Sequence, residues 1–246
     1  MLKQMRLAIK GEVVMTAELA GGIDAMGDMK APRPWVYTVG GTEFSWIIPM
    51  ISSWFNQLML IDEQTRKWLE HDRPPSFWIQ GFSNPAGFMT AAQQEVARKH
   101  SKAPQFWALD EMVYVTQVSH MKDFAAVTSA PSEGVYVHGL TMEGATFDIK
   151  NNTVVESAPK ILFTPLPVLY VTVNKNTEQR KVVREMFGPQ GPYEAPVYKY
   201  AVRGDGYPGN PDIKNFFFFV QMKCTLEKPP LHWGLRGLAL FAISGN

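Results

Sequence analysis

Apolar side chains recur every three or four positions through the first hundred residues, which is the spacing of helices rather than strands. Between residues 54 and 69 this spacing gathers one apolar face, made by Trp54, Leu58, Ile61, Thr65, Trp68 and Leu69. The prolines of residues 72–75 then end the pattern, because proline lacks the amide proton that a helix interior needs. A long amphipathic helix is therefore predicted to end near residue 70.

Two further helical segments are marked by capping residues. Asn84 suits the N-cap of a helix, and Pro85 suits its first helical position. Basic residues near position 99 complement the C-terminal end of the helix dipole, so the helix is predicted to end there. The opening residues 2–26 also predict helix, broken near Gly11 and restarted with Thr16 as its N-cap.

The spacing changes to that of strands after residue 104. Short runs rich in valine, tyrosine, phenylalanine and isoleucine alternate with clusters of glycine, proline, asparagine and aspartate. These runs occupy residues 111–119, 134–140, 145–149, 167–173, 195–202, 215–224 and 234–243. Asn151 and Asn152 tolerate positive φ and predict a hairpin turn. The spacers are hairpin-length, which favours an antiparallel sheet or barrel.

The sequence therefore predicts an α+β fold in which helices and strands are segregated. A helical subdomain is expected over residues 1–104, and an antiparallel β-barrel-like subdomain over residues 105–246.

Composition limits the classes of function. The 246 residues are 46% hydrophobic and carry a formal net charge of +1. Basic residues are scattered apart from a short cluster at 179–184, so no nucleic-acid partner is expected. The single cysteine, Cys224, lies in an apolar run and suits a buried, reduced thiol. No leader and no apolar stretch of about 20 residues is present, so an intracellular location without a membrane partner is expected.

The motifs of common cofactor and catalytic sites are missing. The glycines of residues 39–46 lack the lysine of a P-loop. The five histidines have no partner at metal-ligand spacing, and no Gly-x-Ser-x-Gly turn marks a hydrolase nucleophile. Neither a cofactor nor a metal is therefore expected in this protein.

The segment of residues 134–163 is the densest candidate for chemistry. Strand alternation places His138 among aromatic and apolar neighbours, which predicts a half-buried histidine. Glu143 directly precedes a glycine and is expected to hold a turn by accepting backbone amide protons. Asp148 and Glu156 flank the predicted hairpin. Shape is favoured over catalysis, and a hydrolase using His138, Glu143 and Asp148 is the alternative.

Four consecutive phenylalanines also need an explanation. Side chains of a strand alternate between its two faces, so Phe216, Phe217, Phe218 and Phe219 require cover on both faces. Cover from within the protein is the first expectation, and a partner surface at these four residues is the second.

Motifs in matching order resemble the C-terminal domain of dynein heavy chains over nearly the whole length. They lie at residues 11–19, 32–35, 53–70, 75–98, 134–168, 195–203 and 232–241, the stretch "GVYVHGLTMEGATFDIKNNTVVESAPKILFTPLPV" being the most similar. The positions that carry the resemblance include Trp78, Gly81, Phe82, Gly139, Glu143, Gly144, Pro196, Tyr198, Lys199, Trp233, Arg236 and Gly237.

The resemblance implies a non-catalytic regulatory module that packs on the AAA+ ring of its own heavy chain and tunes a microtubule motor. ATP and magnesium would belong to ring modules elsewhere in a much longer polypeptide, and the microtubule would be contacted only indirectly. An axonemal motor of cilia or flagella is expected. The alternative is a free-standing β-barrel module that binds a protein through Phe216–Phe219.

Overall fold

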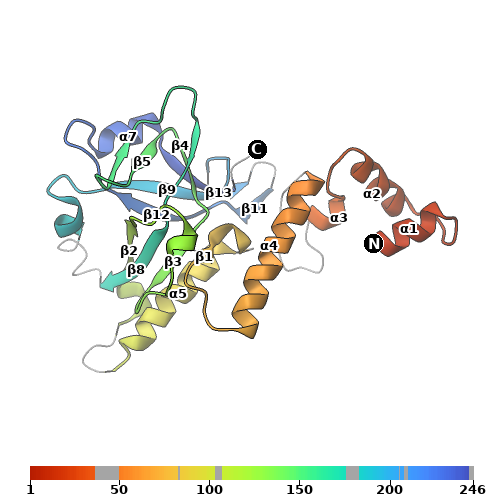
Figure 1. The fold of residues 1–246 in the computed structure, drawn as a ribbon, viewed down its shortest axis with the longest axis horizontal. Coiled ribbons are helices and arrows are strands. Elements are labelled where there is room, and N and C mark those ends of the chain that lie inside the picture. Colours follow the sequence, from red (N-terminus) through yellow and green to blue (C-terminus); the bar gives the residue numbers. More distant parts are fainter. Residues whose placement is uncertain are drawn as a thin grey trace. The chain divides into compact units, whose positions relative to one another are not determined.

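The computed structural model describes residues 1–36, 50–82, 84–102, 107–175, 183–204, 206–207 and 210–243 (Figure 1). The polypeptide divides into two compact units, residues 1–66 and 67–246. The expected boundary between residues 104 and 105 lies outside the described residues.

The first unit contains helices. They are α1 (Leu2–Ile9), α2 (Ala17–Gly27), α3 (Arg33–Val36) and most of α4 (Ile51–Glu70). Thr16 caps α2 by accepting a hydrogen bond from the Leu19 amide at 3.2 Å, and Gly11 takes a positive φ of 75° after α1. The predicted break and restart are therefore confirmed.

Helix α4 follows the predicted bounds closely, but its apolar face is largely uncovered. Trp54 is its one buried side chain within the part of the protein that the structure describes. That indole donates to the Trp35 carbonyl at 3.3 Å and lies 4.9 Å from the Trp35 ring.

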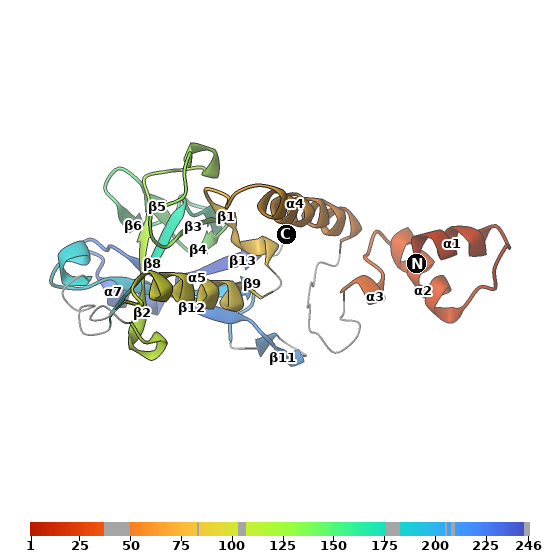
Figure 2. The same cartoon turned by 90° about the horizontal axis from the view of Figure 1, so that it is seen from below.

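The second unit holds the strands together with further helices and turns of helix. The long helix is α5 (Pro85–Lys99), whose N-cap Asn84 accepts from the Gly87 amide as predicted. Short 3-10 turns are η1 (Ile79–Gly81), η2 (Leu109–Glu111) and η3 (Phe124–Ala126), and the last helix is α7 (Pro230–Arg236). Helix α5 packs against β8 and β12 (Figure 1 and Figure 2).

The strands form two main sheets and two hairpins. The four-stranded sheet has the order β1-β3-β8-β2, and the five-stranded sheet has the order β12-β9-β13-β4-β7. Their bounds are β1 (Phe77–Trp78), β2 (Met112–Val118), β3 (Val135–His138), β8 (Leu169–Lys175), β4 (Thr141–Glu143), β7 (Phe163–Pro165), β9 (Tyr193–Tyr200), β12 (Phe216–Met222) and β13 (Ala239–Ile243). The hairpins are β5 (Thr146–Asp148) with β6 (Thr153–Val155), and β10 (Gly206–Tyr207) with β11 (Asn210–Lys214).

An α+β fold is confirmed, but the barrel-like closure is not. Among the described strands no ladder closes the sheets into a barrel. The edges of β2 and β12 meet through side chains instead: Gln221 N donates to Thr116 Oγ1 at 2.6 Å, and Thr116 N donates to Gln221 Oε1 at 3.4 Å. One buried core still spans both sheets, so the β-rich unit packs around a common interior without a continuous ladder.

The predicted strand at residues 234–243 is wrong in its first half. Residues up to Arg236 belong to α7, which starts with Pro230 and ends at Gly237 in the left-handed conformation. Pro230 in the first turn and Gly237 after the last turn are signals of a helix, but the apolar run of residues 234–243 predicts a strand. The hairpin turn is confirmed at Asn152, whose φ is 54°.

The phenylalanine run is covered unevenly. Phe218 lies in the core, Phe217 packs against it, and Phe219 is 49% exposed. The register of β12 on β9 shifts between Phe216 and Phe218, so the strand is irregular there. The expectation that the protein itself buries these phenylalanines is therefore confirmed for Phe217 and Phe218 but not for Phe219.

A comparison of two glycines distinguishes the energetic cost of a side chain at positive φ from the additional cost of a steric clash. Gly134 (φ 77°) and Gly188 (φ 81°) share a backbone conformation, but a Cβ on Gly134 would lie 2.3 Å from the Val171 carbonyl oxygen, whereas a Cβ on Gly188 meets nothing within 4 Å. We expect Gly134→Ala to lower the free energy of unfolding by about 1–3 kcal/mol more than Gly188→Ala, because the backbone must shift. Urea denaturation of both variants measures the difference, and equal losses would contradict it.

Candidate functional site

Several of the residues that carry the resemblance gather around α7, where β4 turns toward β5. Arg236 Nε donates to the Gly144 carbonyl at 3.0 Å, which ties the turn to the helix. Gly144 has a φ of 80°, and the Trp233 side chain of α7 is fully buried. We call Glu143, Gly144, Arg203, Arg236 and Gly237 the α7 site.

An ion pair completes the α7 site. Arg203 Nη2 donates to Glu143 Oε2 at 2.6 Å, and its guanidinium lies so close to Gly237 that a Cβ there would be 2.7 Å from Nη1. The expectation that Glu143 holds its own turn through backbone amides is therefore wrong, because its carboxylate is bonded from a distant segment. Sequence reasoning missed Arg203, although it ends the motif at residues 195–203.

Gly237 serves both the helix end and the ion pair. Its φ is 71°, and the amide of Leu238 donates back to the Trp233 carbonyl at 3.1 Å, which forms a glycine-ended helix cap. Only a residue without a side chain allows this turn and the close approach of Arg203 together.

A second carboxylate beside α7 lies among three basic side chains. Glu156 Oε1 lies 2.8 Å from Lys228 Nζ, 3.6 Å from Arg236 Nη1 and 3.7 Å from His232 Nε2. The hydrogen bond from Lys228, followed by its charge, lowers the pKa of Glu156. A carboxylate held ionised in this way is poorly suited to proton transfer near neutral pH.

Asp148 stabilises the hairpin turn through hydrogen bonds, in agreement with the interpretation that favoured a structural role over catalysis. Its carboxylate accepts from the amides of Lys150 and Asn151 and from the Asn151 side chain. These hydrogen bonds, that from the Asn151 side chain first, lower the pKa of Asp148.

His138 is half-buried, in agreement with the prediction. Its Nδ1 lies 2.7 Å from Ser76 Oγ, and Phe124 stacks on the ring at 4.5 Å. Burial lowers the pKa of His138 to about 4, so the ring is neutral near pH 7. His138, Glu143 and Asp148 thus each have separate partners.

Other predicted positions pack where β3 leads into β4. Gly139 has a φ of 91°, and a Cβ on it would lie 2.5 Å from Trp78 Cδ1. Gly81 ends η1, and the Phe82 ring stacks on Phe88 at 4.2 Å. These residues fix the path of the backbone between the two sheets.

The remaining predicted positions lie on β9, beside the phenylalanine run. Pro196 is opposite Phe219, and the Tyr198 ring is 6.1 Å from Phe216. Lys199 is only 5% exposed, and burial lowers its pKa to about 8.

The described part of the protein offers no constellation for a metal. No group of three or more histidine, cysteine, aspartate or glutamate side chains lies there in an arrangement that could hold an ion. Across the same residues, no helix combines the length and the apolar character needed to span a bilayer.

Comparison with known proteins gives a consistent set of relatives. The family model for the C-terminal domain of the dynein heavy chain matches residues 1–242. The sequence is 35% identical over 240 residues to "Dynein axonemal heavy chain 5" of Mus musculus, 36% over 241 to "Dynein axonemal heavy chain 8" of Homo sapiens, and 37% over 241 to "Dynein gamma chain, flagellar outer arm" of Chlamydomonas reinhardtii. Each alignment covers 97% of the 246 residues but only 4–5% of the relative.

The pair of Glu143 and Arg203 should show measurable coupling. Its side chains are 24% and 49% exposed, so a double-mutant cycle with Glu143→Gln and Arg203→Gln should give about 0.5–1 kcal/mol, and less in 1 M salt. The control pairs Glu143→Gln with Arg98→Gln, a residue of α5, and should be additive. Coupling no larger than that of the control would show that the pair does not form.

His138 should make stability depend on pH in mildly acidic solution. Its pKa is 6.5 when unfolded and about 4 when folded, so the unfolded protein binds more protons between these values. The contribution is present above pH 6.5 and is lost as pH falls toward 4. The pH dependence of urea denaturation across this range should be less steep in His138→Gln, by at most about 1.4 kcal/mol per pH unit. Parallel curves for the two proteins would contradict the assignment.

Proposed function

This protein belongs to the family of C-terminal domains of dynein heavy chains, and we propose that it is a non-catalytic module that packs on the AAA+ ring of its heavy chain and tunes the motor. The expected family is confirmed. The proposed location is the axoneme of a cilium or flagellum, because the relatives carry axonemal and flagellar names. ATP, magnesium and the microtubule are assigned to other parts of the heavy chain.

Separate pairing of the candidate catalytic groups supports a non-catalytic role. Glu143 is bonded by Arg203, Asp148 by its own hairpin, and Glu156 by Lys228. Each of these three acidic side chains has a partner that explains its position by shape and charge alone.

Exposed leucines on α7 are the observation that carries the proposal. Leu231 and Leu235 are 71% and 82% exposed, and a spacing of four residues places them on the same side of a helix. Leu162 is also exposed, and its carbonyl accepts from the Gly144 amide at 3.0 Å, so it adjoins the α7 site. We call Leu162, Leu231 and Leu235 the leucine surface.

The proposed occupant of the leucine surface is the rest of the same heavy chain. The 246 residues span about a twentieth of the length of the relatives they match, so most of the protein that could cover these side chains lies elsewhere in that polypeptide. Fully burying one leucine is worth about 1.5–3 kcal/mol. A contact made in one ring conformation and lost in another would therefore shift the balance between them, whereas equal contact with both would shift nothing.

Replacing the leucines tests the proposal in the intact motor. The variant carrying Leu231→Ser and Leu235→Ser should change velocity, run length or stall force several-fold in single-molecule assays. Coupling free energies between sites are usually about 1–3 kcal/mol, which corresponds to a change of this size. The affinity of the motor for microtubules, with the ring held in one nucleotide state, should remain unaltered.

Leu109→Ser is the matched control, since Leu109 is an exposed leucine on η2. Single-molecule records of the double variant that superimpose on those of the unmodified motor would refute the role of the leucine surface.

A free-standing binding module remains the second candidate because Phe219 is half exposed beside the less exposed Phe216. An antibody against residues 107–175 distinguishes the two in cell extracts. A band of heavy-chain size supports the ring module, and a band near 27.7 kDa supports the free-standing one.

A further inference from the structure

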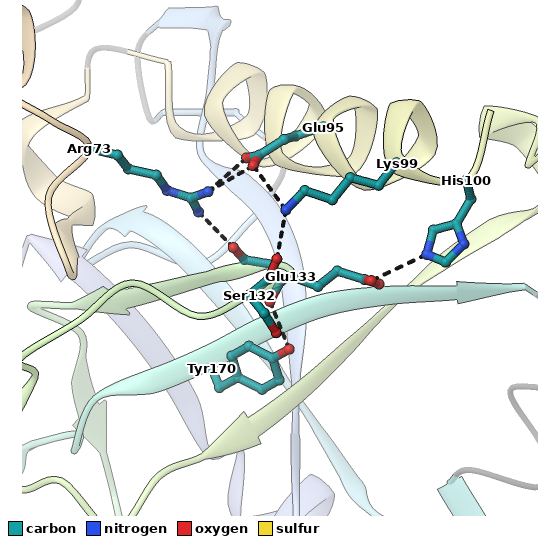
Figure 3. A network of polar contacts seen from close by, with 8 residues as sticks. Arg73, Glu95, Lys99, His100, Ser132, Glu133 and Tyr170 are labelled. Atoms are coloured by element: carbon teal, nitrogen blue, oxygen red, sulfur yellow. Dashed lines mark hydrogen bonds and ion pairs between the residues drawn. The ribbon is translucent and has the colours of Figure 1, made fainter. Parts of the chain in front are cut away.

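The loop that leads into β3, at residues 132–134, accepts hydrogen bonds from side chains in three parts of the second unit (Figure 3). Three successive carbonyl oxygens each accept one hydrogen bond, from Arg73 to Gly134 at 2.6 Å, from Lys99 to Ser132 at 2.7 Å and from Tyr170 to Glu133 at 2.8 Å. The donors come from the segment after α4, from α5 and from β8. We call this arrangement the clamp.

Charge pairing reinforces the clamp. Arg73 Nη1 donates to both oxygens of Glu95 at 2.8 and 3.0 Å, and Lys99 Nζ lies 3.5 Å from the same carboxylate. His100 Nε2 lies 3.2 Å from the Glu133 carboxylate. The Arg73 side chain is 25% exposed, so its bonds are better shielded than those of a surface pair. Its planar guanidinium thus joins α5 and the loop at the same time.

Arg73 lies in the connection between α4 and the first strand. Helix α4 ends at Glu70, and its last turn belongs to the second unit. There Trp68 contacts Phe77 at 4.8 Å, and the Arg73 guanidinium lies 5.8 Å from the same ring. Residues 71–76 between α4 and β1 have no helix or strand, so without fixed contacts they would act as a hinge.

We propose that the clamp makes this connection a rigid joint, which carries a displacement of the last turn of α4 into β3 instead of letting residues 71–76 absorb it. Arg73 fixes the middle of the connection at two points, Glu95 on α5 and the Gly134 carbonyl at the start of β3. Strand β3 lies between β1 and β8, so a shift at Gly134 moves the sheet. The inference concerns motion within the second unit and goes beyond the proposed function, whatever the protein binds.

The loop itself is built to resist displacement. Gly134 is packed against the Val171 backbone so closely that no side chain fits, and its neighbour Val135 is paired with the same Val171. The joint is therefore stiff on the side of the sheet. Within the connection, Arg73 holds the middle, and the contact of Ser76 with His138 of β3 holds the end next to β1.

Spin-label distance measurements in the folded 246-residue protein test the joint. Nitroxides are placed at Leu69→Cys, in the last turn of α4, and at Leu235→Cys, both of which are 82% exposed, whereas the native Cys224 is buried. Replacing Arg73 by Gln should widen the distance distribution by about twofold, because the backbone of residues 71–76 regains freedom. Arg98→Gln, which changes another arginine beside the clamp on α5, should leave the width unchanged.

Arg73→Lys gives a second, gentler test. One ammonium group cannot bond Glu95 and the Gly134 carbonyl with the geometry of a guanidinium, so the width should lie between those of the native protein and Arg73→Gln. Native width in both Arg73 variants would overturn the proposal, as would equal broadening in Arg98→Gln. Circular dichroism checks folding, and loss of the fold in both Arg73 variants would overturn the joint in favour of a purely structural role.

Discussion

The β-rich unit depends on one backbone constraint, the crossing of the polypeptide between its two sheets at Gly139. This residue has a φ of 91° and lies directly against the Trp78 indole, so only glycine can occupy it without strain. The crossing lets β3 belong to the four-stranded sheet while β4, only a few residues later, belongs to the five-stranded sheet. Both sheets can then enclose one core although no ladder among the described strands joins them all.

The same short stretch links the two polar centres. Gly134, at the start of β3, is held by Arg73, and Gly144, after β4, is held by Arg236. Each contact uses an arginine as the donor and a backbone carbonyl as the acceptor. Residues 134–144 therefore form a continuous backbone segment whose ends are fixed by Arg73, in the connection after α4, and by Arg236, on α7.

Local signals in the sequence predicted individual helices and turns better than they predicted how these elements pack together. Thr16 and Asn84 mark helix starts because capping acts within one turn, and the turn at Asn152 is equally local. The edge bond between Thr116 and Gln221 joins residues 105 positions apart, and Arg203 reaches Glu143 across 60, so no spacing rule could find either. The motifs named Glu143, Gly144, Arg236 and Gly237, whereas their partner Arg203 became visible only in the fold.

The junction of β2 and β12 has a mechanical consequence. Strands in a ladder share a bond at nearly every second residue, but this edge is held by the two reciprocal bonds between Thr116 and Gln221. The ladder of β12 on β9 is much longer than this two-bond junction. Among the described strands, tension across this junction is therefore resisted by the shared apolar core and two hydrogen bonds, whereas within each main sheet it is resisted by a ladder.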